Sequence, residues 1–331
     1  MAALLVSRFF MPSVFFIVGP TAVGKSTLAA EVAEQLGADI VNADAFQMYR
    51  GLDILTGKPD ARTQRRAPHH LLGSVPLDDV MSAAKFRALA LRTLAEIRSR
   101  EKDAIIVGGS GLYVKALTHG FDNVPPPDRE LRVQLNGLPL KELVWQLQKT
   151  NPTLASRVDL KNRRRITRAL EIALGAKNHS STHWDGMAAA GVDRDQISAA
   201  ETTSTAQGER RGSESGVLLI RDREDLYDRI NNRVIAMFHV GVEEEVRALT
   251  EIGVTAARAL GLPQLQQFTA GEISREECIA KIQQATRRYA KRQLTWFRHQ
   301  SNFPQLNLTP FSHQEAVSAV LQMAQRRLAR G

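Results

Sequence analysis

The sequence predicts an α/β protein whose parallel sheet core is interrupted by an all-helical insert. Three observations support this fold class. Short apolar runs alternate with helical patterns over residues 14–121, three prolines at 125–127 end that alternation, and a further apolar run, Val217–Ile220, follows a long polar stretch. Alternating strands and helices are typical of parallel sheets. We therefore expect a core domain over 1–121 and 216–331 and a helical domain over 122–215.

The first part of the chain supplies most of the expected sheet. Three short runs are expected to form buried strands, each leading to a loop or a helix: Val14–Val18, Asp39–Asp44 and Ala104–Val107. Helices are expected at Thr27–Leu36, which Gly37 would cap, and at Ser82–Arg100, which carries an apolar stripe.

The rest of the chain is mainly helical in pattern. The insert is expected to contain helices at Glu130–Leu135, Leu140–Lys149 and Lys161–Leu174. After it, residues 177–216 are rich in Ser, Thr, Gly and Ala, which predicts a flexible polar connection at the end of the insert. Beyond the strand Val217–Ile220, helices are expected at Asp225–Thr250, Ser274–His299 and His313–Leu328.

Composition limits the function classes. The 331 residues are 43% hydrophobic and 24% charged, which is ordinary for a globular protein. Lys and Arg exceed Asp and Glu by 44 to 35, so the net charge of +9 favours a polyanionic partner. The single cysteine, Cys278, excludes an internal disulfide and is typical of a cytoplasmic protein. No apolar run is long enough to cross a bilayer, so we expect no membrane association.

The strongest motif follows the first strand. Residues 19–26 match G-x-x-x-x-G-K-S between an expected strand and an expected helix, which is the context of a phosphate-binding P-loop. In such a loop the backbone N–H groups surround a phosphate, the lysine adds a positive charge and the serine hydroxyl binds Mg²⁺. We therefore expect a diphosphate or triphosphate to bind at Gly19, Pro20, Thr21, Ala22, Val23, Gly24, Lys25 and Ser26.

Asp44 is the acid nearest to this loop in the predicted sheet. The strand Ala104–Val107, where an ATPase would place a metal-binding aspartate, ends in Gly108 and Gly109 instead. At the carboxyl end of its own strand, Asp44 would face the ligand crevice. Three roles remain open for it on the residues alone: orienting Mg²⁺, acting as a base, or capping a turn.

Further motifs accompany the phosphate loop and Asp44. They are the run from Asp44 to Ile54, Thr56, Lys58-Pro59, Pro68 to Leu71, Gly108 to Tyr113, Arg165 with Arg168 to Glu171, Leu226 to Ile230, and Ala290 to Trp296. Together with the loop at 19–26 they resemble the tRNA dimethylallyltransferase family over residues 14–298, and several of them are specific to that family. The resemblance implies a P-loop core similar to that of kinases, with a helical insert that grips the anticodon stem-loop.

The resemblance also implies a reaction and its residues. The family transfers a dimethylallyl group from dimethylallyl diphosphate to N6 of the adenosine at tRNA position 37, beside the anticodon. By similarity, Ser26 would bind Mg²⁺, Asp44 would accept the N6 proton, and Arg223 would stabilise the leaving diphosphate. The expected tRNA contacts are Asp44, Ala45, Phe46, Gln47, Ser110, Arg132, Arg164, Arg165, Ile166, Thr167, Arg168 and Arg258. A monomer with no obligate protein partner would suffice.

The sequence departs from the family pattern at a few positions. Ala45 stands where serine is usual, Leu55 where glycine is usual, and Ser110 where threonine is common. Leu262, which Pro263 follows, stands after Gly261 where a tyrosine is usual. Several departures fall among expected tRNA contacts, so they bear on RNA choice more than on chemistry. The alternatives are a prenyltransferase acting on free adenine nucleotides, a small-molecule P-loop kinase, and a non-enzymatic RNA-binding protein. The long basic insert favours a polymeric substrate.

Overall fold

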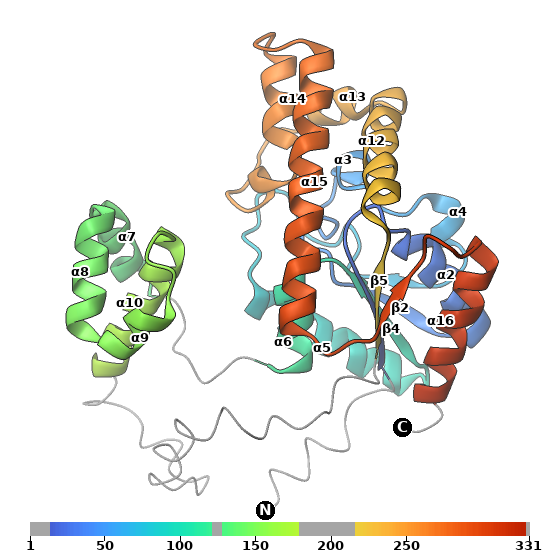
Figure 1. Ribbon diagram of the computed structural model, residues 1–331, viewed down its shortest axis with the longest axis horizontal. Helices are drawn as coiled ribbons and strands as arrows, with labels where there is room; N and C mark the ends of the chain where they lie inside the picture. Colours follow the sequence, from blue (N-terminus) through green and yellow to red (C-terminus); the bar gives the residue numbers. More distant parts are fainter. Residues whose placement is uncertain (1–13, 121–127, 179–215, 329–331) are drawn as a thin grey trace, which may run out of the picture. The chain divides into compact units, whose positions relative to one another are not determined.

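The computed structural model describes residues 14–120, 128–178 and 216–328 (Figure 1). These residues fall into two compact units. We call residues 14–120 with 216–328 the α/β unit and residues 128–178 the helical unit. The predicted polar connection lies almost entirely outside the described residues. Within the described ranges, no helix combines the length and apolar character needed to cross a membrane.

The α/β unit is built on a six-stranded parallel sheet with the strand order β3-β2-β4-β1-β5-β6. The strands are β1 (Val14–Val18), β2 (Asp39–Asn42), β3 (His69–His70), β4 (Ala104–Gly108), β5 (Gly216–Ile220) and β6 (Gln305–Asn307). The central strand β1 aligns Phe16 with Ile106 of β4 and with Gly216 of β5. Because all strands are parallel, the loops after β1, β2 and β4 lie together at the carboxyl ends of the strands.

Successive side chains of the strands pack alternately into two hydrophobic cores, one on each face of the sheet. Phe15 and Ile17 are fully buried against α2 (Lys25–Leu36) and α16 (His313–Leu328). Phe16 and Val18 face the opposite core, which is formed with α5 (Ala83–Ser99), α6 (Gly111–Thr118) and α15 (Arg275–Gln300). Burial on both faces explains why β1, β4 and β5 are apolar throughout.

One predicted helix is two helices in the structure. The pattern over Asp225–Thr250 forms α12 (Arg223–His239) and α13 (Val242–Arg247). Gly241 separates them with a φ of 95°, a left-handed conformation that ends a helix. Shorter helices complete the unit: α3 (Asp53–Thr56), α4 (Ala61–Gln64), the 3₁₀-helix η2 (Ala256–Arg258) and α14 (Leu262–Thr269), which lies beside α15 in Figure 1.

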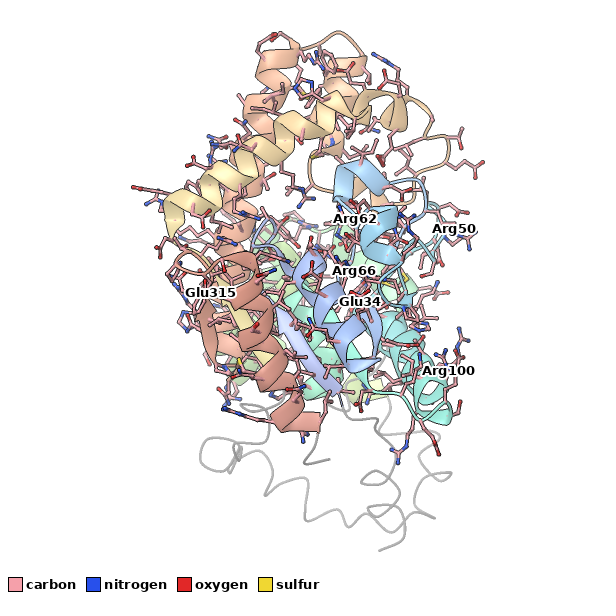
Figure 2. All side chains as sticks on the ribbon, turned by 90° about the vertical axis from the view of Figure 1, so that its right-hand side faces the viewer. Glu34, Arg50, Arg62, Arg66, Arg100 and Glu315 are labelled. Carbon is pink, nitrogen blue, oxygen red and sulfur yellow. The ribbon has the colours of Figure 1, made fainter. Side chains whose placement is uncertain are left out.

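Ion pairs stabilise the sheet away from the loops that follow β1, β2 and β4. Asp39, at the start of β2, is fully buried and pairs with His70 at 2.8 Å, Arg100 at 2.9 Å and Lys102 at 3.3 Å. Burial opposes its ionisation, but hydrogen bonds from His70 and Lys102 and the nearby positive charges outweigh burial and lower its pKa. His70 therefore has a structural role at this end of β2. On the α2 side, Arg66 pairs with Glu34 (Figure 2).

The helical unit has a hydrophobic core of its own. It contains α7 (Arg129–Gly137), α8 (Leu140–Thr150), α9 (Pro152–Arg157) and α10 (Arg163–Asn178). Leu143, Leu147, Ile166 and Leu170 are fully buried where α8 packs against α10. Predicted helices in this region are confirmed, with ends that differ by a few residues.

Candidate active site

The phosphate loop adopts the strand–loop–helix arrangement that its motif requires. β1 ends at Val18, and α2 begins at Lys25, the residue after Gly24. Gly24 has a φ of 104°, which a residue with a Cβ rarely adopts, so glycine is needed at this turn into the helix. The first N–H groups of α2 therefore lie beside the loop, where they favour an anion.

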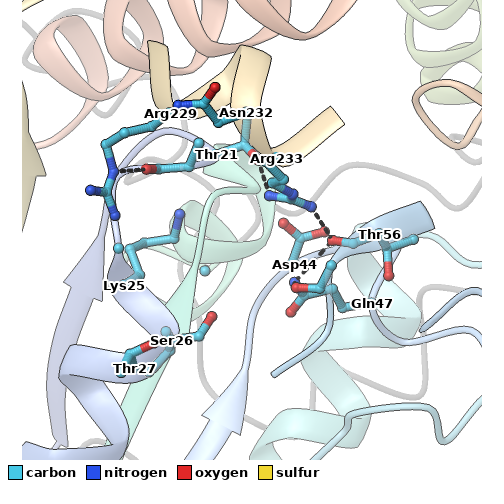
Figure 3. A pocket seen from close by; sticks show the side chains of 15 residues that line it. Thr21, Lys25, Ser26, Thr27, Asp44, Gln47, Thr56, Arg229, Asn232 and Arg233 are labelled. Carbon is cyan, nitrogen blue, oxygen red and sulfur yellow. Dashed lines mark hydrogen bonds between the residues drawn. The ribbon is translucent and has the colours of Figure 1, made fainter. Parts of the chain in front are cut away.

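A cavity of about 440 Å³ lies over this loop (Figure 3). Its walls come from the loops after β1 and β2, from the end of β4, from the start of α2, from the end of α3, and from α12. The lining residues are Thr21, Ala22, Gly24, Lys25, Ser26, Thr27, Asp44, Gln47, Thr56, Gly57, Val107, Gly108, Arg229, Asn232 and Arg233. Gly108 ends β4, and glycine is needed there because a Cβ would lie 2.2 Å from the carbonyl oxygen of Ala43, in the segment after β2.

Three cations line the cavity. Lys25 Nζ donates to the Pro20 carbonyl at 2.7 Å. Burial lowers the pKa of Lys25 to about 8; Asp44 opposes this effect and Arg233 adds to it. Arg233 donates from Nη1 to Thr21 Oγ1 at 2.9 Å and from Nη2 to the Thr56 carbonyl at 2.8 Å. Arg229 donates to the Ala22 carbonyl at 3.0 Å. The arginine bonds hold the phosphate loop against α12.

Asp44 has one of the roles that the sequence leaves open, that of capping a turn, and its side chain also lines the cavity. Its Oδ1 accepts the N–H of Phe46 at 3.1 Å, as in an Asx turn, and its own N–H donates to Asn42 Oδ1 at 3.1 Å. The same side chain lines the cavity and faces Arg233 from the opposite wall (Figure 3). The turn therefore holds the carboxylate beside the phosphate loop.

A second, apolar cavity of about 40 Å³ adjoins the first. Thr21, Asp44, Thr56 and Arg233 line both cavities. The remaining lining residues of the second are mostly apolar: Phe46, Leu55, Val234, Met237, Leu260, Ile282, Thr286 and Tyr289. The first cavity is polar and cationic and the second is apolar. The Asp44 carboxylate and the Arg233 guanidinium line both of them.

Known proteins resemble this chain over most of its length. A family model described as IPP transferase matches residues 47–300. The tRNA dimethylallyltransferase of Akkermansia muciniphila is 36% identical over 92% of this chain and 96% of its own length. That of Geobacter metallireducens is 40% identical over 86% and 88%.

The chain belongs to the IPP transferase family. A solved structure agrees: the tRNA isopentenylpyrophosphate transferase of Bacillus halodurans is 29% identical, with a TM-score of 0.65 and coverage of 96% of this chain and 97% of its own. The family, the P-loop fold class and the transferase class that the sequence predicts are therefore confirmed.

The structure corrects the place of one predicted catalytic residue of this IPP transferase. Arg223 is the first residue of α12, is exposed, and lies over the Tyr227 ring at 5.2 Å. It lines neither cavity. Arg229 and Arg233 lie further along the same helix and reach the site because helical spacing points both toward the phosphate loop. That spacing is a signal that the sequence contains.

Other predicted contacts in the α/β unit fall into three groups. Ser110 Oγ accepts the Ala45 N–H at 2.9 Å, and Gln47 Nε2 donates to the Gly57 carbonyl at 3.0 Å, so both hold the loops around Asp44. Phe46 lines the apolar cavity. Arg258 is exposed in η2 and lines neither cavity.

In the helical unit, the residues predicted to contact tRNA differ in how far they are buried. Arg132 and Arg168 pair with the buried Glu171, Arg168 at 3.0 Å. Arg164 and Arg165 are exposed. Ile166 is fully buried and Thr167 is 5% exposed, so their side chains belong to the core of the unit, and a contact of these two residues with RNA stays a prediction.

The donors at the site suit one kind of metal binding. Among the described residues, no group of three or more His, Cys, Asp or Glu side chains could hold a cation alone. The cavity offers the Ser26 hydroxyl and the Asp44 carboxylate. Mg²⁺ commonly binds through one or two protein oxygens, water and substrate phosphates. These residues therefore fit Mg²⁺ that arrives with a diphosphate.

Proposed function

We propose that this chain transfers a dimethylallyl group from dimethylallyl diphosphate to N6 of the adenosine at tRNA position 37, beside the anticodon. The products are N6-dimethylallyladenosine and diphosphate. One observation carries the proposal: a polar, cationic cavity over the P-loop adjoins an apolar cavity, and Asp44 and Arg233 line both. An allyl diphosphate has the same division into an anionic part and a small hydrocarbon part.

The polar cavity would hold the diphosphate. The loop N–H groups, Lys25 and Arg233 supply hydrogen-bond donors and positive charge, and Ser26 would hold Mg²⁺. When bound, the metal supplies charge neutralisation for the phosphate oxygens. As the C1–O bond of the substrate breaks, negative charge grows on the leaving oxygen. Donors already fixed in position stabilise that charge without reorganising, which lowers the barrier. Arg233, at the junction of the cavities, takes the role expected of Arg223.

The apolar cavity would hold the five-carbon chain. Leu55, Val234, Met237 and Ile282 offer hydrocarbon surface and no charge. Burial of each CH₂ contributes about 0.8 kcal/mol, so the cavity discriminates the prenyl ester from other diphosphates. It also limits water near the reactive carbon, where hydrolysis would compete with transfer.

Asp44 would act on the nucleophile. The N6 nitrogen forms a bond to C1 as the C1–O bond breaks, and N6 then loses one proton. Asp44 lies between the two cavities, where N6 must approach C1, so its carboxylate is the acceptor for that proton. An adenine reaches such a position only when it leaves the base stack, as in other enzymes that modify bases.

The helical unit would bind the tRNA. Arg164 and Arg165 are exposed at the start of α10, and the net charge of the chain is +9. Cations on the surface bind phosphates without reading sequence, which suits recognition of a stem by shape. The residues of both cavities come from one chain, so a monomer suffices. We place the reaction in the cytoplasm.

The test is a comparison of acceptors. The chain is incubated with labelled dimethylallyl diphosphate and Mg²⁺, together with tRNA, AMP or ATP in parallel. We expect label in tRNA alone, at the adenosine beside the anticodon. Label in AMP or ATP would favour a nucleotide prenyltransferase. Phosphate transfer from ATP without prenyl transfer would favour a kinase, and tRNA binding without any transfer would favour an RNA-binding protein.

A further inference from the structure

A buried glutamine on α15 connects two loops of the site. Gln293 is 6% exposed. Its Oε1 accepts the Thr21 N–H at 2.9 Å, and its Nε2 donates to the Gly109 carbonyl at 2.9 Å. Thr21 belongs to the phosphate loop and Gly109 to the loop after β4. The two bonds span 272 and 184 residues of sequence, so no local motif reveals them.

The bonding pattern fixes the orientation of the Gln293 amide. An N–H group requires an oxygen opposite it, and a carbonyl requires an NH₂. A rotated amide would set oxygen against oxygen and nitrogen against nitrogen, and both bonds would be lost in a buried place. Gly109 contributes by its size, because a Cβ there would lie 2.3 Å from Gln293 Nε2. The hydrogen bond from Gln293 therefore requires a residue without a side chain at position 109.

The same network reaches the loop of Asp44. Ser110, next to Gly109, accepts the Ala45 N–H at 2.9 Å. Tyr289, one turn before Gln293 on α15, lies near the side chains of Ser110 and Gln293, and burial raises its pKa. Tyr289 also lines the apolar cavity with Asp44. Loops that follow the three adjacent strands β1, β4 and β2 are therefore joined through α15.

We propose that Gln293 is a positioning residue that sets the distance between the phosphate loop and Asp44. The inference rests on the proposed function for its consequence, since that distance separates the leaving diphosphate from the proton acceptor. Gln293 does not face the substrate; it acts through Thr21 and Gly109. A displacement of about 1 Å between reacting groups can cost about 10²-fold in rate.

The experiment compares three variants in the full chain. Gln293→Met has similar length and forms neither bond. Gln293→Glu retains an acceptor for Thr21 but faces the Gly109 carbonyl with a second oxygen. Phe297→Leu is the matched control, because Phe297 is fully buried one turn later on α15. For each we measure the melting temperature, the single-turnover rate at saturating tRNA and dimethylallyl diphosphate, and the affinity for Mg²⁺-pyrophosphate by calorimetry.

We expect Gln293→Met to lower the rate by about 10²-fold, with a smaller loss of pyrophosphate affinity of about three- to tenfold. Gln293→Glu should fall between Gln293→Met and the parent. Phe297→Leu should lower the melting temperature while its rate stays within twofold. If Gln293→Met fails to fold, the single-turnover rates of Gln293→Glu and Phe297→Leu are compared instead, and a lower rate for Gln293→Glu supports the positioning role.

Equal rates per folded molecule in the Gln293 variants and Phe297→Leu would overturn the positioning role. The pyrophosphate measurement separates this result from failure of the proposed function. If the parent transfers no prenyl group but its pyrophosphate affinity exceeds that of Gln293→Met, the loop is still positioned by Gln293. If the affinities are equal in that case, the inference is wrong.

Discussion

The two units use arginine in different ways. In the α/β unit, Arg229 and Arg233 face a cavity and bind carbonyl and hydroxyl groups of its wall. In the helical unit, Arg132 and Arg168 pair with one buried carboxylate, Glu171. Arg163 donates to the Asn136 carbonyl at 2.6 Å and also to the carbonyls of Leu135 and Leu138, at the end of α7.

The comparison shows that a cluster of arginines in sequence is not one surface. Along α10, Arg163 and Arg168 contact the interior of the helical unit, whereas Arg164 and Arg165 are exposed. A helix turns about 100° per residue, so neighbours in sequence face different environments. The contrast between charges that line a cavity in one unit and charges that are paired or exposed in the other is testable.

The largest effect is expected at Asp44. Asp44→Asn retains the shape of the side chain but cannot accept a proton, so the single-turnover rate should fall by about 10²–10⁴-fold. Affinities for tRNA and pyrophosphate should stay within a few fold. Asp228→Asn, an exposed change on α12, is the control. Full recovery of the Asp44→Asn rate at high Mg²⁺ would assign Asp44 to the metal.

The structural arginines should affect the stability of the helical unit. Arg132→Met leaves Glu171 buried with fewer partners, which should lower the free energy of unfolding of the helical unit. Because the Arg132 side chain is itself 42% exposed, solvent weakens the pair, and we expect a decrease of about 2–3 kcal/mol. Amide exchange in α7 and α10 should accelerate, which mass spectrometry measures. Arg164→Met is the matched control, and similar protection in the two variants would show that the ion pair contributes little.

Lys25 makes the α/β unit sensitive to pH. Its pKa of about 8 means that the ammonium is present below pH 8 and is lost above it, whereas an ordinary lysine loses its charge near pH 10.4. Affinity for Mg²⁺-pyrophosphate should therefore fall above pH 8, by up to about tenfold per unit. Lys25→Arg keeps its charge and should show a flatter profile. Identical profiles would place the diphosphate away from Lys25.

The smallest effect is expected from the exposed arginines. Replacing Arg164 and Arg165 by Ala should reduce the slope of log affinity for tRNA against log salt by up to about 1.4–1.8. The control Arg92→Ala with Arg326→Ala removes two exposed charges from α5 and α16. An equal decrease in slope with the control would indicate general electrostatic attraction in place of contacts at α10.

Much of the fold could be predicted because its strands are buried on both faces. β1, β4 and β5 are apolar runs whose pattern needs no tertiary information. β3 and β6 could not be found, since His69–His70 and Gln305–Asn307 are short, polar edge strands formed by pairing with β2 and β5. Gly241 marked the break between α12 and α13, but the apolar pattern continues through it.

The parts of the site that directly follow a strand in the sequence could be predicted. The phosphate loop and Asp44 follow strands, so the parallel sheet brings them together. Arg233 required the orientation of α12, which depends on packing against both cores of the sheet. Gln293 required the position of α15, because a glutamine in a helix has no distinctive pattern until its partners are known.

The position of β5 in the chain has a consequence for synthesis. Phe16 of β1 pairs with Gly216, so the central strand lacks one neighbour until about 200 more residues have left the ribosome. At roughly 5–20 residues per second this takes about 10–40 s. During that interval the nascent chain presents a bare edge of an apolar strand, which is a template for intermolecular pairing. The helical unit, with its own core, can fold in the meantime, and protection of β1 by a chaperone would matter most before β5 emerges.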